Sequence, residues 1–398
     1  MKISNLRIEN RNKRSYLTAD VVCGFSKENT LWFSLEEHEG HMFSDDVYDA
    51  FMLAALFPCM YYNEPIEIKG AVSKELYYNL VRYVYSIIQA FRPEMHRVEI
   101  KVDGFAIAKQ NKEKIVGTGF SGGVDSFATI VEHYINEPED EYRLNHLFFF
   151  NLGQYGDPSK SDSYERAYNR YLFCKVATDD IGLPYSFMDT NLFAFYKPEW
   201  EHHSDELNRT IAIFCIQRAC CRYYAPSAHT YEQHVNFPVE HYATITGFAE
   251  HMLTSLLSTE VCKNILDGSQ YTRVDKVKLI KDYLPAQKYL NVCTNIEEGH
   301  TDGANCSYCG KCQRTMCELD LLGLSESFSN VFNFSKWHKV KYSLLCAMRA
   351  TCNSDIYGYE IIELAREKGV RTPFYLEAFI VYQFNRVINR IKRTFSKR

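Results

Sequence analysis

The segment at residues 121–126, with the sequence SGGVDS, constrains the fold most. It follows a short apolar stretch, Lys114 to Phe120, that is typical of a strand, and it precedes a stretch, Phe127 to Tyr134, that is typical of a helix. A glycine pair between a strand and a helix lets the backbone turn sharply and leaves its N–H groups uncovered. The start of a helix adds unpaired N–H groups and the positive end of the helix dipole. We therefore expect this segment to hold an anion, and a phosphate chain fits best.

Other phosphate-binding loops fit this segment less well. A Walker A loop needs Gly-Lys-Ser/Thr after its first glycine, and no such run follows here. A dinucleotide fingerprint, G-x-G-x-x-G, is present at residues 117–122, but the acids about twenty residues further on, Glu137 to Glu141, lie in a polar turn. Ser121 and Ser126 supply hydroxyl donors. Asp125 would repel phosphate unless a divalent cation such as Mg²⁺ lay between them.

Composition excludes several classes of protein. The chain has 398 residues, of which 46% are hydrophobic and 24% charged, with a net charge of −5. These values are ordinary for a soluble globular protein and give no global reason to expect binding to nucleic acid or to a membrane. The longest apolar stretch, Ala50 to Tyr62, is short and contains Pro58, and the N-terminus lacks the apolar core of a signal peptide. We expect a cytoplasmic protein, in which clustered cysteines bind metal rather than form disulfides.

Strands and helices alternate after residue 110. Leu144 to Asn151 reads as a buried strand with three consecutive phenylalanines, Tyr164 to Ile181 as a helix, and Tyr185 to Met188 as a strand. Ile211 to Tyr224 reads as a further helix, and His241 to Ile245 as a further strand. This alternation predicts an α/β fold with a parallel sheet covered by helices on both faces. Ligands of such sheets sit outside the carboxyl ends of the strands.

The pattern predicts three regions. Residues 1–110 form an α+β accessory domain, in which Ser73 caps a helix from Lys74 to Phe91. Because this region carries no recognisable chemistry, we expect it to bind a protein partner or a macromolecular substrate. Residues 111–320 form a second domain, which contains SGGVDS and a group of cysteines, and residues 321–398 form a helical region with a basic end.

A cysteine cluster gives the second strong signal. Cys306, Cys309 and Cys312 are spaced as C-x₂-C-x₂-C, and the fourth ligand of a tetrahedral zinc site is either Cys293 or Cys317. With Cys317 the run differs by one residue from the ferredoxin spacing and lacks its proline, so we favour zinc over an iron–sulfur cluster. Four cysteines leave no open coordination position, which indicates a structural zinc site.

The two motifs together resemble a known family. SGGVDS resembles the PP-loop of the ATP pyrophosphatase superfamily, and an SGGxDS loop followed much later by Cys…Cys-x₂-Cys-x₂-Cys resembles the 7-cyano-7-deazaguanine synthases, the QueC family. The similarity covers residues 114 to 319 and implies a Rossmann-like parallel sheet of the PP-loop/HUP type with a zinc knuckle. In that family an enzyme adenylates a carboxylate with ATP, releases pyrophosphate and transfers the activated group to ammonia. The family therefore implies ATP, Mg²⁺ and Zn²⁺ as ligands.

The resemblance also implies site residues. Within it, Cys293 stands at the first zinc cysteine, Asn151 and Gln154 stand in a strand-end segment of the family, and Lys276 resembles a lysine ahead of the first cysteine. Arg273 and Lys276 carry the charge needed to neutralise an α-phosphate as the adenylate forms. The expected nucleotide-binding residues are Ser121, Gly122, Gly123, Val124, Asp125, Ser126, Asn151 and Gln154. The expected catalytic residues are Asp125, Ser126, Arg273 and Lys276, and the expected zinc ligands are Cys293, Cys306, Cys309 and Cys312.

Substrate and nucleophile stay open at this point. Asn151 replaces an acidic residue of the family, so the adenylation chemistry is better supported than a 7-deazaguanine substrate. QueC-like proteins with added domains occur in bacterial antiviral operons, where a modified base can be attached to a protein, which makes a protein acceptor conceivable. Two alternatives remain. One is a PP-loop sulfurtransferase, and the other is a non-catalytic nucleotide-binding regulatory or defence protein.

Overall fold

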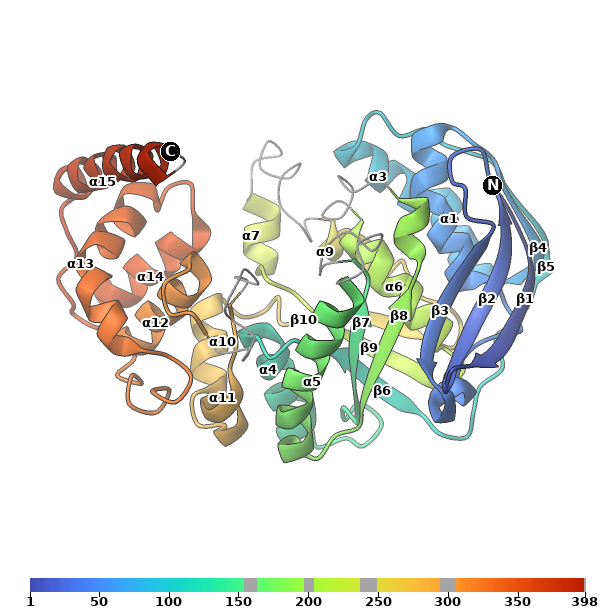
Figure 1. Ribbon diagram of the computed structural model, residues 1–398, viewed down its shortest axis with the longest axis horizontal. Helices are drawn as coiled ribbons and strands as arrows, with labels where there is room; N and C mark the ends of the chain where they lie inside the picture. Colours follow the sequence, from blue (N-terminus) through green and yellow to red (C-terminus); the bar gives the residue numbers. More distant parts are fainter. Residues whose placement is uncertain (154–162, 197–203, 237–248, 294–304, 397–398) are drawn as a thin grey trace. The chain divides into compact units, whose positions relative to one another are not determined.

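Two compact units make up the described chain. The computed structural model describes residues 1–153, 163–196, 204–236, 249–293 and 305–396 (Figure 1). We call Met1–Ser121 with Glu132–Ser269 the sheet unit, and Gly122–Val131 with Gln270–Arg398 the helical unit. Ser121 therefore belongs to the sheet unit, whereas the other five residues of SGGVDS belong to the helical unit.

These units differ from the three regions predicted from the sequence. Residues 1–110 share the sheet unit with the strands that follow, because β3 (Thr30–Glu36) pairs with β8 (Tyr185–Thr190) and joins the N-terminal strands to the same sheet. Residues 111–320 are divided between the two units, and residues 321–398 belong to the helical unit together with the cysteine-rich segment. The change in sequence pattern near residue 110 marks a change in strand connectivity within one unit.

The sheet unit is built on one sheet with the strand order β10-β9-β6-β7-β8-β3-β2-β1-β4-β5. Neighbouring strands from β10 to β8 are parallel, as are β1, β4 and β5, while β2 and β3 supply the antiparallel pairs. The predicted α/β class with a mostly parallel sheet is confirmed. The remaining strands are β1 (Lys2–Arg11), β2 (Arg14–Val22), β4 (Ile66–Val72), β5 (Ile100–Phe105), β6 (Ile115–Gly119), β7 (His146–Asn151), β9 (Cys220–Pro226) and β10 (Lys263–Asp267).

The five parallel strands β6 to β10 have the order of a doubly wound sheet. Numbered along the chain from β6, they lie side by side as 3-2-1-4-5, so the winding direction reverses between β6 and β9. Ligands of doubly wound sheets bind outside the carboxyl ends of the strands at this reversal. β6 ends at Gly119, and SGGVDS begins two residues later at Ser121, so the predicted phosphate loop begins at the reversal point of the sheet.

Strand β7 shows why both faces of the sheet are covered. Phe149 contacts Phe187 of β8 and Tyr171 of α5 (Ser163–Ile181), so α5 covers this face. Phe148 and Phe150 lie on the opposite face because side chains alternate along a strand. They join a core that includes α6 (Asp205–Cys215) and α1 (Asp49–Tyr62). The predicted three-phenylalanine strand and the predicted helix over residues 164–181 are both confirmed.

The N-terminal helices follow their predicted signals. The Ser73 hydroxyl accepts a hydrogen bond from the Leu76 N–H and caps a helical stretch that runs to Phe91, as predicted. This stretch contains α2 (Lys74–Asn79), a π-helical turn (Leu80–Val84) and α3 (Tyr85–Phe91). The other short helices in the described part of the sheet unit are 3-10 turns at Glu37–Met42 and Leu192–Phe195, with α7 (Tyr231–Asn236) and α9 (Glu250–Leu253).

One element predicted as a helix is two elements. The predicted helix from Ile211 to Tyr224 ends with α6 at Cys215, and the chain then enters β9, the strand between β6 and β10. The apolar periodicity of α6 continues into an equally apolar short strand, and a short apolar run does not distinguish the two structures. The strand predicted at His241 to Ile245 lies outside the described residues.

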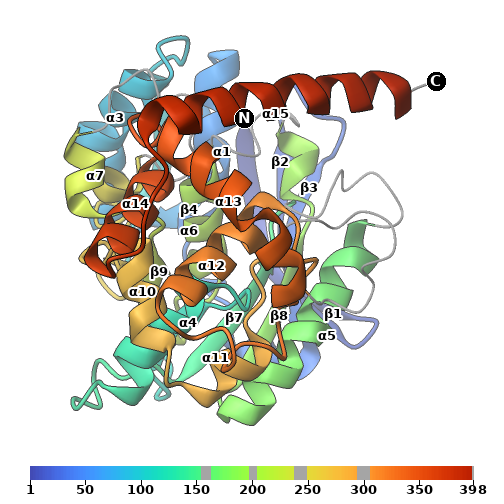
Figure 2. The same ribbon diagram turned by 90° about the vertical axis from the view of Figure 1, so that its left-hand side faces the viewer.

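The helical unit contains α4, which follows the glycine pair, and the helices after residue 270. Helix α4 packs against α10, α10 packs against α12 and α14, and α13 packs against α15, which is one long unbroken helix (Figure 2). The chain after Leu321 is therefore helical, as predicted. The bounds are α4 (Val124–Ile130) with a π-helical turn that continues it (Val131–Ile135), α10 (Arg273–Ile280), α11 (Leu284–Tyr289), α12 (Gly310–Leu321), α13 (Phe334–Thr351), α14 (Ile356–Glu367) and α15 (Tyr375–Ser396).

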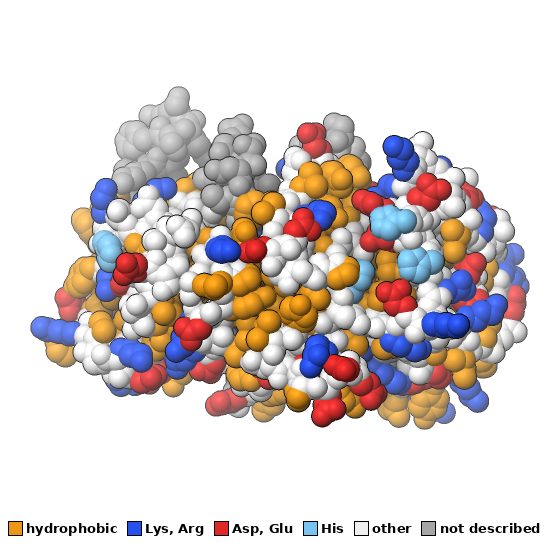
Figure 3. Space-filling model, turned by 90° about the horizontal axis from the view of Figure 1, so that it is seen from below, with side chains coloured by type: hydrophobic (Ala, Val, Ile, Leu, Met, Phe, Trp, Pro, Cys, Tyr) orange, Lys and Arg blue, Asp and Glu red, His pale blue; other side chains and the backbone are white. Residues whose placement is uncertain are grey.

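Charge is mixed on the face shown in Figure 3, where acidic and basic side chains are interspersed. This mixture agrees with the modest net charge of −5. Of the helices in the described part of the chain, none combines the length and the apolar character needed to cross a bilayer.

Candidate metal centre and anion site

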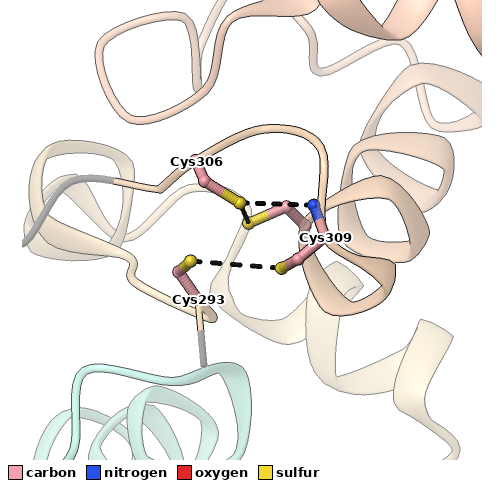
Figure 4. Close-up of side chains that lie close together, drawn as sticks. Cys293, Cys306 and Cys309 are labelled. Carbon is pink, nitrogen blue, oxygen red and sulfur yellow. Dashed lines mark hydrogen bonds between the residues drawn. The ribbon is translucent and has the colours of Figure 1, made fainter. Parts of the chain in front are cut away.

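Four cysteines of the helical unit converge on one point, as the sequence predicts. The thiol sulfurs of Cys293, Cys306, Cys309 and Cys312 all lie within 4.8 Å of one another. The Cys293 and Cys309 sulfurs are 4.0 Å apart (Figure 4). The Cys306 and Cys312 sulfurs are 3.8 Å apart. Four sulfurs held tetrahedrally at about 2.3 Å from Zn²⁺ would be about 3.8 Å apart. The cluster therefore has the donors and the spacing of a closed Zn(Cys)₄ site.

The local backbone explains how three of these cysteines meet. Ser307 adopts the left-handed conformation, with φ of 60°, which turns the chain sharply between Cys306 and Cys309. The Cys309 N–H donates to the Cys306 sulfur over 3.2 Å, and Gly310 then begins α12, which carries Cys312. Burial opposes ionisation of the Cys306 thiol, but backbone N–H groups of Tyr308 and Cys309 outweigh it and lower its pKa. A thiolate favoured in this way is a metal ligand.

The structure also resolves the choice of fourth cysteine. Cys293, from the segment after α11, completes the cluster, whereas Cys317 is not among the converging residues. Cys317 is fully buried in α12, and burial raises the pKa of its thiol. Cys293 is therefore the fourth candidate ligand, and Cys317 is a core residue.

The glycine pair is tied to this cluster. Gly122 has φ of 76°, in the left-handed region that glycine adopts without strain. Its carbonyl oxygen accepts a 2.7 Å hydrogen bond from the N–H of Asn291, two residues before Cys293. Asn305, beside Cys306, accepts from the Val292 N–H over 2.9 Å and donates to the Leu290 carbonyl over 2.8 Å. The segment that carries Cys293 thus links the phosphate-loop candidate to the cysteine cluster.

Asp125 and two cations of α10 form the centre of the site. One carboxylate oxygen of Asp125 accepts from the Arg273 guanidinium over 2.7 Å, and the other accepts from the Lys276 ammonium over 3.1 Å. Burial alone would raise the pKa of Asp125, but the charges of Arg273 and Lys276 hold it below its usual value. The structure thus brings three of the four predicted catalytic residues into direct contact. In this arrangement Asp125 fixes the positions of both cations.

The fourth predicted catalytic residue, Ser126, lies one position further along α4. Its hydroxyl is almost fully buried and donates to the Gly123 carbonyl oxygen over 3.0 Å. Val124 is fully buried and anchors the helix start in the core.

Helix α12 adds a row of polar side chains that the sequence interpretation missed. Lys311, Arg314, Thr315 and Glu318 are spaced i, i+3, i+4 and i+7 and so share one helical face, which we call the α12 polar face. Lys311 is exposed, Arg314 is half-buried, and Thr315 and Glu318 are fully buried, so the row runs from solvent into the interior. The cysteines of this segment indicated metal binding, so its polar residues were not considered. Their helical spacing could have been found from the sequence by assuming that a helix starts after Cys309.

Helix α14 closes the charged region. The Arg273 backbone N–H donates to the Glu360 carboxylate over 2.9 Å, and the Arg314 guanidinium stacks over the Tyr357 ring at 3.8 Å. We call Arg273, Lys276, Lys311 and Arg314 the basic cluster. In this structure the buried Nε atoms of Arg273 and Arg314 have no hydrogen-bond partner among the described residues. Planar guanidinium groups with donors to spare suit a phosphate or another oxyanion.

The other predicted nucleotide-binding residues belong to the sheet unit. The Ser121 carbonyl oxygen accepts from Arg170 over 2.5 Å. Asn151, at the end of β7, donates to the Asp189 carboxylate over 2.8 Å, and burial raises the pKa of that carboxyl. Gln154 lies outside the described residues.

Comparisons with protein-family models, with curated proteins and with solved structures found no match. The functional argument therefore rests on the motifs and on the geometry of the two units.

Proposed function

We propose that this protein is an ATP-dependent enzyme that adenylates a carboxylate or a carbonyl oxygen, releases pyrophosphate and transfers the activated group to a nitrogen nucleophile. One observation carries the proposal. Asp125, from the SGGVDS segment that resembles a PP-loop, contacts both Arg273 and Lys276, although these residues lie far from it in the sequence. A loop that resembles a pyrophosphate seat is thus supplied with two cations in fixed positions.

Each of these residues is assigned a role in stabilising the negative charge of the departing pyrophosphate. Cleavage between the α- and β-phosphates builds negative charge on the departing pyrophosphate, and preorganised donors stabilise that charge. Arg273 and Lys276 supply positive charge, while the Gly123 region and Ser126 supply a backbone turn and a hydroxyl. Asp125 orients the two cations, and its free electron pairs suit Mg²⁺, which ATP brings with it. The segment has no lysine for a γ-phosphate, which separates it from a Walker loop.

The cysteine cluster would support this site structurally. A closed Cys₄ shell leaves no position for substrate, so Zn²⁺ there would hold the segment before Cys293 against the start of α12. That segment holds Gly122, and α12 carries Arg314. Metal binding at this cluster therefore supports the geometry of the proposed phosphate site.

The substrate is proposed from the resemblance alone. A 7-deazaguanine carboxylate is the first candidate, and a protein is a candidate acceptor for the activated group in antiviral defence. The sulfurtransferase alternative needs a reactive thiolate, and burial raises the pKa of Cys174 and Cys221 in α5 and β9. The non-catalytic alternative predicts that ATP binds without turnover.

The test is isotope exchange between labelled pyrophosphate and ATP, catalysed by the full-length protein with a panel of carboxylates that includes 7-carboxy-7-deazaguanine. An adenylating enzyme moves the label into ATP only with the right carboxylate and needs no nucleophile. Mass spectrometry of small molecules that copurify with the protein would narrow the panel. With a substrate in hand, ADP and phosphate as the only products would contradict the proposal.

A further inference from the structure

Glu318 lies at the inner end of the α12 polar face. The side chain is fully buried, and neither carboxyl oxygen has a hydrogen-bond partner among the residues that the structure describes. A buried carboxylate without hydrogen bonds is costly, because nothing replaces the water that it loses. Such a group needs a specific reason, and the reason lies in its neighbours.

Charged groups from four helices act on Glu318. Arg273 comes from α10, Arg314 from α12 itself, Glu360 from α14 and Asp125 from α4, all near enough to interact electrostatically without a direct hydrogen bond. Helix α13 also packs on α12, but its Lys341 pairs with Asp320 over 2.6 Å. Burial raises the pKa of Glu318 to about 7, against the opposing effect of Arg273 and Arg314. The change between the neutral and the ionised carboxyl therefore falls near neutral pH.

An oxyanion bound by the basic cluster would change this balance. A dianion beside Arg273 and Arg314 neutralises their positive charge. These arginines then stabilise an ionised Glu318 less. Two negative groups close together in a buried setting repel each other strongly, and protonation of one of them removes the repulsion. Glu318 is the group that can accept the proton, because Asp125 is held ionised by direct contacts with Arg273 and Lys276.

We propose that Glu318 is a proton-linked counter-ion of the basic cluster, so that an oxyanion binding at Arg273 and Arg314 is accompanied by uptake of one proton from solvent at the Glu318 carboxylate. This inference deepens the proposed function and rests on it for the identity of the anion, a phosphate group of ATP or pyrophosphate. Departure of the anion releases the same proton. Binding should accordingly be tighter at low pH and weaken by up to about tenfold per pH unit above pH 7.

Calorimetric titration of the full-length protein with sulfate tests this proposal. Sulfate remains a dianion across the neutral range, so any proton taken up belongs to the protein. Titrations at pH 7.5 in phosphate-free buffers of different ionisation enthalpy measure the number of protons taken up. We expect most of one proton for the natural protein. We expect almost none for Glu318→Gln, whose sulfate affinity should also no longer fall with pH.

Two further variants make the result specific. Glu318→Asp keeps a titratable acid at the same place and should restore proton uptake. Glu363→Gln removes a carboxylate of α14 that pairs with Arg366 at the surface, and it should behave like the natural protein. If Glu318→Gln does not fold, infrared difference spectra of the natural protein, recorded with and without sulfate, should show a new protonated carboxyl band.

Three results would overturn the inference: no sulfate binding, sulfate binding without proton uptake, or equal uptake in the natural protein and in Glu318→Gln. Sulfate binding involves no ATP chemistry. A failure here would therefore leave a positive pyrophosphate exchange result standing, and a failed exchange assay would leave proton-linked sulfate binding standing.

Discussion

Two buried acids in different regions of the molecule show how surroundings decide what a carboxyl group does. Asp49 of α1 and Glu318 of α12 are both fully buried, and burial raises the pKa of each to about 7. Asp49 accepts a 2.6 Å hydrogen bond from the Ser73 N–H and a 2.8 Å bond from the Gln217 side chain. Glu318 has no such bond among the described residues and faces two arginines instead.

The Asp49 region is a fixed cross-link within the fold, and the Glu318 region is not. Gln217 also accepts from Thr259 over 2.8 Å, so Asp49 belongs to a hydrogen-bonded network that joins α1, the start of α2 and the turn after α6. Every hydrogen-bond partner in this network is a group of the protein. Arg273 and Arg314 each have a buried donor atom without a partner among the described residues. The Asp49 region is therefore complete in itself, whereas the Glu318 region retains donors for a bound anion.

Loss of the zinc site should destabilise the helices around Glu318 strongly and the helices around Asp49 little. Cys309→Ala should abolish binding of about one zinc per chain. Structural zinc contributes on the order of 10 kcal/mol in small zinc domains, and metal binding is coupled to folding. Metal analysis should show the loss, and hydrogen exchange should become much faster in α12 while α1 and α6 keep their protection.

Cys317→Ala is the matched control for that prediction. It removes a buried thiol of the same helix outside the cluster and should retain the zinc, with a stability loss of about 1–2 kcal/mol. Iron and a brown chromophore in the purified protein would favour the iron–sulfur cluster instead. Zinc retained in Cys293→Ala but lost in Cys317→Ala would show that the fourth ligand is assigned incorrectly.

Asp125→Asn should give the largest effect on chemistry. The amide would no longer hold Arg273 and Lys276 by charge, so pyrophosphate exchange should fall on the order of 100-fold, as for loss of one preorganised charge-stabilising group. Zinc content and the overall fold should be unchanged. Ser126→Ala, which removes a hydroxyl bonded to Gly123, should cause a smaller loss of roughly tenfold.

Asp282→Asn serves as the control for Asp125→Asn. Asp282 follows α10 and has a side chain 86% exposed, so its loss should leave the exchange rate nearly unchanged. An Asp125→Asn protein that exchanges pyrophosphate at the natural rate would remove Asp125 from the mechanism.

Asp49→Ala should test the cross-link in the sheet unit. The change leaves the Ser73 N–H and the Gln217 amide without their acceptor in a buried setting, which should lower the free energy of unfolding by about 3 kcal/mol. Glu318→Gln leaves no hydrogen-bonded partner behind and should cost clearly less at neutral pH. Denaturant unfolding of both variants measures the difference. Equal losses would mean that the two acids play the same structural role.

The fold was predictable where local signals and burial agree. Three consecutive phenylalanines favoured a strand buried on both faces, and Ser73 caps its helix as its position predicts. Strand β9 was missed because only four residues separate it from the end of α6, so the predicted helix was extended through it. The pairing of β3 with β8 joins residues more than 150 positions apart, and no local pattern encodes such a pairing.

The candidate site was predictable where covalent spacing constrains it. The C-x₂-C-x₂-C spacing predicted three converging thiols, and Cys293 joins them as the resemblance implied. The sequence assigned Asp125, Arg273 and Lys276 to one site, but their direct contact was not predicted, because Asp125 was expected to face a divalent cation and the two basic residues a phosphate. Arg314 and Glu318 were missed because the sequence does not show which face of α12 is buried against its neighbours. That face is defined only by the packing of α10, α12 and α14.

The smallest expected effect concerns pH and separates the contributions of the two acids to stability. Glu318 has a pKa of about 7 in the folded protein against 4.5 as an ordinary glutamate, so the folded state binds more protons than the unfolded state between these values. Its unfavourable contribution therefore grows as pH rises through this window, by about 1 kcal/mol between pH 6 and pH 8. Asp49 should contribute a similar amount with the same sign, because its folded pKa is also raised to about 7.

The free energy of unfolding of the natural protein should thus decrease from pH 6 to pH 8, and Glu318→Gln should remove about half of this decrease in sulfate-free buffer. Added sulfate should make this decrease steeper in the natural protein if it binds beside Glu318, because the sulfate-bound folded state keeps the Glu318 proton to higher pH, and it should leave the Asp49 contribution in Glu318→Gln unchanged. A pH dependence identical in the natural protein and in Glu318→Gln would show that Glu318 does not titrate in this range, and the contrast between the two buried acids would then be one of hydrogen bonding alone.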